Sequence, residues 1–357
     1  MTLIIAEAGV NHNGDEDLAF ALVDAAVASG ADIVKFQTFN AKSLATAEAK
    51  QATYQQRNTG QTESQLQMLS RLELSYDAHL RLQAYSKQRG IGFLSTAFDD
   101  LSLQFLLGPL QLNLLKIPSG EITNAPFVLQ HARSQRDLIV STGMANLAEI
   151  EAVLGVIAFG LTMPVEAKPT ASAFAKAYAS KQGQTALKQK VTLLHCTTEY
   201  PAPASDINLT AMDSMAAAFG LAVGYSDHSA GIAIAIAAVA RGATVLEKHF
   251  TLDKNLPGPD HKASLQPDEL SQMVKAIREV EQALGDGIKR PAPSELANKA
   301  VARKSLVASR AIQAGEQLTA ELIACKRPGT GTSPYHYWDL LGKSASRAYR
   351  EGEPFAE

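Results

Sequence analysis

The sequence predicts a (β/α)₈ barrel followed by a small C-terminal module, and three observations support this. The chain has 357 residues, which suits a barrel of ~250 residues plus a smaller domain. Hydrophobic residues make up 46% of the chain but aromatic residues only 6%, a composition typical of helices packed on parallel strands. Eight short apolar runs alternate with helical patterns, as in right-handed βαβ units around a parallel sheet.

The eight runs are short and rich in β-branched residues or Leu, as buried strands are. They cover residues 3–8, 32–38, 91–97, 113–118, 137–142, 191–197, 221–226 and 244–250. The clearest amphipathic helical patterns lie between or after them, at residues 16–29, 76–89, 147–159 and 267–284. Eight units favour a closed barrel over a doubly wound sheet. No Gly-x-Gly-x-x-Gly motif follows the first strand, which argues against a dinucleotide-binding fold.

The expected domain organisation is a barrel over residues 1–285, a linker over 286–300 and a small module over 301–357. The linker DGIKRPAPSELANKA contains Gly, Pro and charged residues. Within the module, AIQAGE predicts a turn at Gly315 and KRPGTGTSP predicts a loop. Residues 161–190, rich in Ala, Lys and Gln, are expected to form a long surface helix or an insertion without chemistry.

Charge and cysteine content argue against several classes of protein. The 33 basic and 36 acidic residues give a formal net charge of −3, so binding to nucleic acid or to an anionic membrane is not expected. Cys196 and Cys325 are too few for a disulfide framework. Residues 1–10 lack the basic start of a signal peptide, and the apolar stretch 230–240 is too short to cross a bilayer. A soluble cytoplasmic protein is expected.

Polar residues follow every predicted strand, and barrel enzymes build their sites from such residues at the carboxyl ends of the strands. In strand order they are Glu7; Lys35 and Gln37; Ser95 and Thr96; Lys116, Ser119 and Glu121; Ser141; His195 to Tyr200; Ser226, Asp227 and His228; and Glu247, Lys248 and His249. A purely structural barrel would not carry polar residues at all eight ends. The sequence therefore predicts an active site there.

Two histidines at the ends of consecutive strands, His228 and His249, are candidate metal ligands. Adjacent strands lie about 4.8 Å apart, so both imidazoles can reach one ion. Because the ligand set is poor in sulfur, Mn²⁺ or Mg²⁺ is as plausible as zinc. The alternative is a pair of hydrogen-bonded structural histidines.

Carboxylates supply candidates for proton transfer. Glu7 and Glu121 can orient a water or move a proton, or simply pair with a nearby lysine. Asp227 is expected to orient a neighbouring histidine or lysine. Asp260, in the loop PGPDHKAS, can bind a hydroxyl group.

Lysines and hydroxyls at the same end of the barrel indicate a site for a small phosphorylated anion. They are Lys35, Lys116, Lys248, Ser95, Thr96, Ser119, Ser141 and Ser226. A second interpretation is chemical: one lysine could form a Schiff base, as in metal-free aldolases. Met68, Leu69 and Leu72 share a helical period and are expected in the core, and Cys196 is expected to be a buried apolar residue.

Ten motifs occur along the chain in a fixed order. They are IIAEAGVNHNG (4–14), VKFQTF (34–39), FLSTAFD (93–99), KIPSGEITN (116–124), STGMAN (141–146), LLHCTTEYPAP (193–203), GYSDHS (224–229), EKHFTLD (247–253), PGPDHKAS (257–264) and KRPGTG (326–331). Together they resemble the sialic acid synthase family, and the last resembles a loop of its C-terminal antifreeze-like (SAF, β-clip) domain. ESQLQMLSRLEL (63–74) is most similar to family members that make N,N′-diacetyllegionaminic acid.

The resemblance implies condensation of phosphoenolpyruvate with an N-acetylated amino-sugar aldehyde, which gives a nine-carbon 2-keto acid and phosphate. The implied acceptor is 2,4-diacetamido-2,4,6-trideoxymannose, with N-acetylmannosamine as the alternative. His228 and His249 match the family's ligands for Mn²⁺ or a similar ion, such as Mg²⁺ or Co²⁺. A Schiff-base aldolase and a non-catalytic sugar- or ice-binding protein are the more distant alternatives.

The resemblance also assigns the remaining site residues. Glu7 matches the residue that orients or deprotonates water, and Glu121 matches a carboxylate near the reacting carbons. The phosphoenolpyruvate set is Lys35, Thr96, Lys116, Ser119, Ser141 and Ser226, and the sugar-contacting set is Gln37, Tyr200 and Asp260. Arg327 matches an arginine that reaches the partner subunit's site, which implies a domain-swapped homodimer. Thr198 stands where neuraminate-forming members have asparagine, so that one contact departs from the family pattern.

Overall fold

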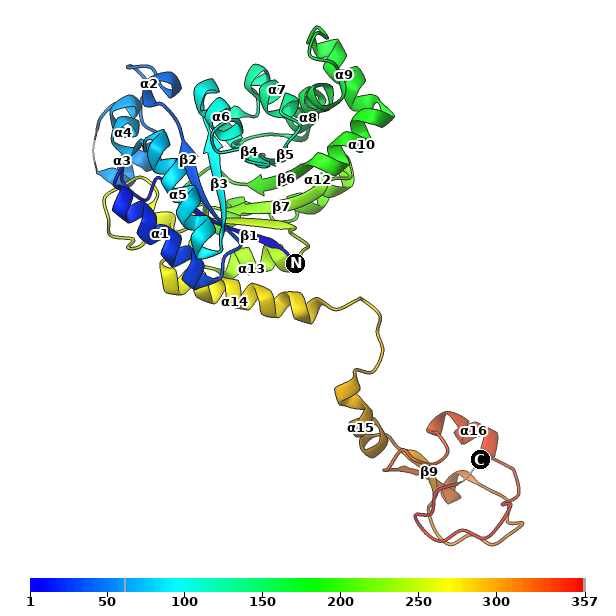
Figure 1. Ribbon diagram of the computed structural model, residues 1–357. Coiled ribbons are helices and arrows are strands. Elements are labelled where there is room, and N and C mark those ends of the chain that lie inside the picture. The colour runs from blue at the N-terminus through cyan, green and yellow to red at the C-terminus, as the bar shows by residue number, and fades with distance from the viewer. Residues whose placement is uncertain (61, 356–357) are drawn as a thin grey trace. The chain divides into compact units, whose positions relative to one another are not determined.

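The computed structural model describes residues 1–60 and 62–355. The chain divides into two compact units, Met1–Gly285 and Asp286–Glu357. The first is a barrel of parallel strands surrounded by helices, and the second is a small unit built around two antiparallel strands (Figure 1). No helix within the described residues is long and apolar enough to cross a membrane.

The barrel contains the eight strands expected from the sequence. They are β1 (Leu3–Gly9), β2 (Ile33–Thr38), β3 (Gly92–Ala97), β4 (Leu114–Ile117), β5 (Asp137–Ser141), β6 (Val191–Cys196), β7 (Ala222–Asp227) and β8 (Val245–His249). Their hydrogen-bonded order is β3-β2-β1-β8-β7-β6-β5-β4, and every pair is parallel. The end strands β3 and β4 also contact each other, so the sheet closes on itself and the predicted barrel is confirmed.

Helices follow the strands and cover the outside of the barrel (Figure 1). Those of the first unit are α1 (Glu16–Ser29), α2 (Ala41–Leu44), α3 (Thr53–Thr59), α4 (Gln65–Leu72), α5 (Tyr76–Arg89), α6 (Asp100–Leu107), α7 (Ala125–Arg133), α8 (Leu147–Thr162), α9 (Ala171–Ala179), α10 (Lys181–Lys190), α11 (Ala204–Ile207), α12 (Ala211–Phe219), α13 (Ala233–Ala240) and α14 (Pro267–Leu284). The Asp15 carboxylate accepts from two backbone amides at the start of α1, and Gly30 ends that helix at φ 78°. Three short helices, α2 to α4, lengthen the connection after β2.

Residues 161–190 form two helices rather than one long helix. Ser180 separates α9 from α10, and its hydroxyl accepts from the Gly183 amide, 2.9 Å away, to cap α10. A Cβ at Gly183 would lie 1.9 Å from the Ala177 carbonyl oxygen, so only glycine fits this close approach. Both helices pack on α8 and on each other.

The predicted linker is partly helical. Helix α15 (Pro293–Ala302) occupies its second half, and the Glu295 carboxylate accepts from the Ala292 amide at 2.8 Å. Proline at the start and good helix formers after it explain why this segment does not remain a loop.

The second unit has its own apolar core. Strands β9 (Ser305–Ala308) and β10 (Ile323–Lys326) pair in antiparallel fashion, and α16 (Tyr337–Leu340) follows. Buried apolar side chains from this unit form one cluster: Leu306, Ala308, Ile312, Leu318, Leu322, Ile323, Ala345, Tyr349 and Phe355. The turn predicted at Gly315 is present, with φ 84°.

Candidate active site

A cavity of about 340 Å³ lies at the carboxyl ends of the barrel strands. Thirteen of the fourteen residues that the family resemblance assigns to the site line it: Glu7, Lys35, Gln37, Thr96, Lys116, Ser119, Glu121, Ser141, Tyr200, Ser226, His228, His249 and Asp260. Strand register explains the grouping, because Glu7 lies beside Lys35 on one side and His249 on the other. Side chains two residues apart on a strand share a face, so the inward-facing polar residues converge.

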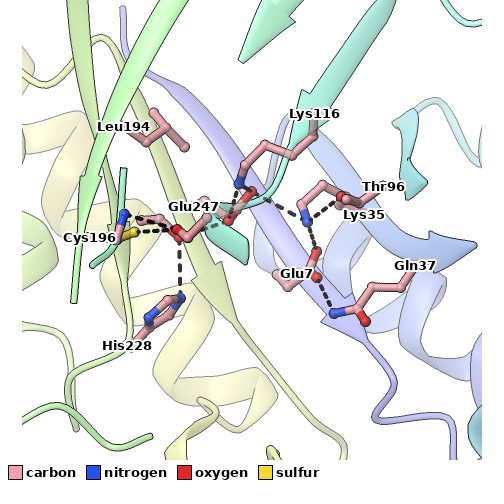
Figure 2. A network of polar contacts seen from close by, with 12 residues as sticks. Glu7, Lys35, Gln37, Thr96, Lys116, Leu194, Cys196, His228 and Glu247 are labelled. Atoms are coloured by element: carbon pink, nitrogen blue, oxygen red, sulfur yellow. Dashed lines mark hydrogen bonds and ion pairs between the residues drawn. The ribbon is translucent and has the colours of Figure 1, made fainter. Parts of the chain in front are cut away.

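Four buried charges that line the cavity form one network of ion pairs (Figure 2). The Lys116 ammonium lies 2.7 and 2.8 Å from the two carboxylate oxygens of Glu247. The Lys35 ammonium lies 2.6 Å from Glu7 and 3.4 Å from Glu247. Two lysines therefore face two carboxylates, with little solvent to screen them.

This pairing shifts the four pKa values in different directions. Burial raises the pKa of Glu7, and Lys35 only partly offsets this. Burial alone would also raise the pKa of Glu247, but Lys116 and Lys35 outweigh it and hold that pKa below its usual range. Burial lowers the pKa of Lys116, whereas the two carboxylates beside Lys35 outweigh burial and raise its pKa. Glu247 is thus the more strongly ionised carboxylate.

Glu247 is a central residue of the site that the sequence analysis placed at a strand end but gave no role. Besides both lysines, its carboxylate accepts from the Ser226 hydroxyl at 2.8 Å. Figure 2 shows it between the lysines and the group around His228. Its position two residues before His249 on the same strand was the available signal, because both side chains then point into the barrel.

The two histidines lie side by side, with ring centroids 5.6 Å apart. The His228 Nδ1 lies 2.6 Å from the Thr197 carbonyl oxygen, which only accepts, so Nδ1 carries the proton and Nε2 keeps a free lone pair. The Tyr200 hydroxyl lies 3.1 Å from this Nε2. The His249 Nδ1 is buried and has no hydrogen-bond partner among the described residues.

Burial keeps both imidazoles neutral. It lowers the pKa of His228 to about 4, and burial together with the neighbouring His228 lowers the pKa of His249 well below its usual range. Neutral imidazole is the form that binds a metal, and a carbonyl bonded to the other ring nitrogen is the usual way to orient such a ligand. Within residues 1–60 and 62–355, no group of three His, Cys, Asp or Glu side chains forms a metal site, so a metal would need ligands besides these two side chains.

Hydroxyl groups line the wall next to the lysines. The Thr96 hydroxyl accepts from Lys35 at 3.2 Å. The Ser119 hydroxyl accepts from the Gly143 amide at 3.0 Å and contacts the Cys196 sulfur at 3.1 Å. The Ser141 hydroxyl is buried without a partner in the part of the chain that the structure describes. A buried unpaired hydroxyl facing a cavity is available to a ligand.

The residues predicted to contact a sugar also line the cavity. Tyr200 stacks on His228 with ring centroids 4.1 Å apart, and the Gln37 amide lies 3.3 Å from Glu7. Burial, with a smaller contribution from Glu7, raises the pKa of Asp260 to about 7. Thr198, the departure from the family pattern, also lines the cavity.

The connection after β2 supplies a wall that the sequence did not reveal. Tyr54, Gln55 and Gln65 line the cavity, although nothing in their pattern marked them. Met68, Leu69 and Leu72, predicted as core, also line it. Met68 and Leu72 are indeed buried in a small apolar cluster, but this cluster lies at the cavity rather than in the barrel core.

Two predicted members of the anion site point the other way. The Lys248 ammonium is fully buried between Asp227, at 2.8 Å, and the Ser229 carbonyl oxygen, at 2.5 Å. The Ser95 hydroxyl lies 2.7 Å from that of Thr38. The prediction for Lys248 and Ser95 was wrong because each adjoins an inward-facing residue, and adjacent side chains on a strand point to opposite faces.

Arg327 belongs to the second unit, whereas every residue that lines the cavity belongs to the first. Its side chain is exposed, and its Nε donates to the Ala302 carbonyl oxygen at 3.0 Å.

The fold and the polar cavity at the strand ends define an enzyme of the (β/α)₈ class. The sequence matches the NeuB family over residues 22–289 and the SAF domain over residues 303–357. The chain therefore belongs to the NeuB family and carries a C-terminal SAF domain, which confirms the resemblance to sialic acid synthases.

Known relatives cover nearly the whole chain. The N,N′-diacetyllegionaminic acid synthase of Campylobacter jejuni is 50% identical over 100% of this chain and 99% of that protein. The enzyme of the same name from Legionella pneumophila is 44% identical over 96% and 90%. The human N-acetylneuraminate-9-phosphate synthase is 33% identical over 99% and 91%. The crystal structure of N-acetylneuraminic acid synthetase from Leptospira borgpetersenii, in complex with citrate, matches with a TM-score of 0.65 and 31% identity over 83% and 90%.

Replacing Glu247 with leucine is expected to destabilise the barrel. The change leaves the Lys116 ammonium, whose side chain is only 4% exposed, without its bidentate partner. Removing one member of a buried ion pair costs about 3–5 kcal/mol of unfolding free energy, measurable by urea denaturation. The double variant Lys116→Met/Glu247→Leu is expected to recover most of this loss. A single variant as stable as the unmodified protein would contradict the assigned pairing.

Proposed function

We propose that this chain condenses phosphoenolpyruvate with 2,4-diacetamido-2,4,6-trideoxymannose to give N,N′-diacetyllegionaminate and phosphate. The observation that carries the proposal is one cavity that joins two neutral histidines to a wall of lysines and hydroxyls, called the lysine–hydroxyl wall: Lys35, Lys116, Thr96, Ser119, Ser141 and Ser226. The names and full-length similarity of the Campylobacter and Legionella relatives support this acceptor over N-acetylmannosamine.

The residues present fit a divalent metal, most simply Mn²⁺, with Mg²⁺ or Co²⁺ as alternatives. The proposed ligands are His228, oriented through its Nδ1 by Thr197, and His249, whose buried nitrogen lacks a partner among the described residues. When bound there, the metal would act as a Lewis acid toward the sugar aldehyde.

The lysine–hydroxyl wall is proposed to bind phosphoenolpyruvate. Lys35 and Lys116 supply positive charge, and four hydroxyls supply hydrogen bonds: Thr96, Ser119, Ser141 and Ser226. The anion brings its own negative charge, so it competes with Glu7 and Glu247 for the ammonium groups. In this arrangement the methylene carbon of phosphoenolpyruvate faces the aldehyde held on the histidine side.

Glu7 is proposed to accept the proton that the reacting water loses. The methylene carbon bonds to the aldehyde carbon, and the aldehyde C=O bond becomes a C–OH group as its oxygen takes up a proton. Water adds to the neighbouring carbon that becomes electron-poor and loses a proton in doing so. Loss of phosphate from the resulting tetrahedral centre leaves the 2-keto acid. The Glu7 carboxylate is buried and its pKa is raised by that burial, so it is a better proton acceptor than an ordinary glutamate. Glu121, at the cavity wall, is proposed to lie near the reacting carbons.

Gln37, Tyr200 and Asp260 are proposed to hold the acceptor sugar. Arg327 is proposed to reach the cavity of a second copy of the chain and bind an N-acetyl group there, which requires a domain-swapped homodimer. The two free cysteines, Cys196 and Cys325, fit a reducing compartment, and we place the reaction in the cytoplasm.

The acceptor is tested by phosphate release with phosphoenolpyruvate, Mn²⁺ and either sugar. We expect kcat/KM to be at least about 100-fold higher for 2,4-diacetamido-2,4,6-trideoxymannose than for N-acetylmannosamine, because a site built for a second acetamido group loses hydrogen bonds when that group is missing. A preference for N-acetylmannosamine would overturn the acceptor assignment. Absence of phosphate release with both sugars would overturn the synthase assignment.

A further inference from the structure

Asn58, on helix α3, forms hydrogen bonds to two loops that follow different strands of the barrel. Its side-chain amide donates to the Pro259 carbonyl oxygen at 2.7 Å and to the Tyr200 carbonyl oxygen at 3.3 Å. Tyr200 lies after β6 and Pro259 lies after β8, so three connections meet at one buried amide. Nothing in the sequence pattern marked this residue.

The chemistry of this contact requires an amide. Backbone carbonyls only accept hydrogen bonds, so the NH₂ group must face both of them, and its two hydrogens serve one carbonyl each. A carboxylate of the same shape would place a negative oxygen against two carbonyl oxygens. Because Asn58 is buried, water cannot readily replace the lost donors.

Helix α3 reinforces the contact through a second residue on the same face. Tyr54 precedes Asn58 by one helical turn, and its ring lies 4.9 Å from that of Tyr200. Tyr200 in turn stacks on His228 and its hydroxyl lies 3.1 Å from the His228 Nε2. The helix therefore fixes both the backbone and the ring of Tyr200.

We propose that Asn58 is a positioning residue for the acceptor sugar. Asn58 does not line the cavity, whereas Tyr200 and Asp260 do. Asn58 holds Tyr200 directly and holds Asp260 through the adjacent Pro259. The lysine–hydroxyl wall stands on other strands, and none of its side chains bonds to Asn58 in the described structure. The inference rests on the proposed function, because it takes Tyr200 and Asp260 to be the residues that bind the acceptor sugar.

The kinetic test is the variant Asn58→Asp in the full-length protein. We expect the KM for the acceptor to rise roughly tenfold while the KM for phosphoenolpyruvate stays within about twofold, since only the acceptor side loses its hydrogen bonds. The matched control is Asn113→Asp at an exposed site, where the side-chain oxygen that accepts from Arg136 is retained; its kinetics should equal those of the unmodified protein. Unchanged acceptor KM in Asn58→Asp would overturn the proposal, as would equal rises in both KM values.

A second measurement keeps this inference separate from the proposed function. Hydrogen exchange of the substrate-free protein should be faster in Asn58→Asp than in the unmodified protein at residues 198–203 and 257–261, with no change in the strands. Unchanged exchange in both loops would overturn the positioning role whatever the acceptor is. If the unmodified protein releases no phosphate with any amino sugar but the exchange changes as expected, the proposed function fails and the loop-fixing role stands.

Discussion

His249→Ala is expected to remove manganese binding and to lower synthase activity by at least about 100-fold, because Lewis-acid activation contributes several kcal/mol to such reactions. The substitution removes one of the two imidazoles that line the cavity among the described residues, and it creates space in the cavity rather than in the apolar core of the barrel. The measurements are metal content after equilibrium dialysis against Mn²⁺, and phosphate release. Circular dichroism should show an unchanged fold.

The matched control for this variant is His336→Ala. His336 is an exposed histidine of the second unit that pairs with Asp339 at 3.0 Å, so its loss should leave metal content and activity unchanged. Stoichiometric manganese in His249→Ala would refute the ligand assignment.

Metal removal separates the synthase from a lysine aldolase on the same barrel. EDTA should abolish phosphate release and Mn²⁺ should restore it. An aldolase would survive EDTA and be trapped at a lysine by borohydride. Lys116 is the residue to examine, because burial lowers the pKa of its ammonium group, the direction that a Schiff-base lysine requires.

Removing residues 301–357 is expected to abolish activity, because the proposed site needs Arg327 from a second copy. The substitution Arg327→Ala isolates this effect from any loss of folding, and we expect it to raise the acceptor KM strongly. Losing a charged hydrogen-bond donor to a buried group costs roughly 2–5 kcal/mol. A fully active truncated chain would disprove the contribution of the second unit.

A mixing experiment tests whether Arg327 acts across a dimer. His249→Ala and Arg327→Ala proteins, each strongly impaired at low acceptor concentration, are unfolded together and refolded. If the site combines one copy's barrel with the other copy's Arg327, half of the dimers are hybrids with one intact site, and about a quarter of the sites recover. If Arg327 acts within its own chain, every site in the mixture carries one of the two substitutions and no activity returns. Absence of recovery would therefore overturn the swap.

Sequence periodicity predicted most of the barrel because each element depends on local pattern. Strand β2 was expected at residues 32–38 and is observed at Ile33–Thr38, and helix α1 matches its predicted range of 16–29. Buried parallel strands are short apolar runs, and surface helices repeat at 3.6 residues, so both are visible in the sequence. The helix α15 was missed because Pro, Gly and charges at 286–292 dominated the segment.

The site was predictable where strand position alone decides which way a side chain points. Polar residues at strand ends predicted the cavity around Glu7, Lys35 and His228. The same reasoning assigned Lys248 wrongly, because it noted the strand end and ignored the alternation that turns Lys248 outward and Glu247 inward. The two-residue period of a strand, applied to β8, excludes Lys248 from the cavity and selects Glu247.

The two histidines illustrate the division between sequence and structure. The sequence by itself determined the strands, their polar ends and the presence of an imidazole at the end of β7 and of β8, because these depend on local pattern. Only the tertiary structure decided that Thr197 orients His228, that Glu247 joins both lysines, and that Asn58 fastens the loops around Tyr200. These contacts join residues between 31 and 212 positions apart, and no local pattern records which distant groups the closed barrel brings together.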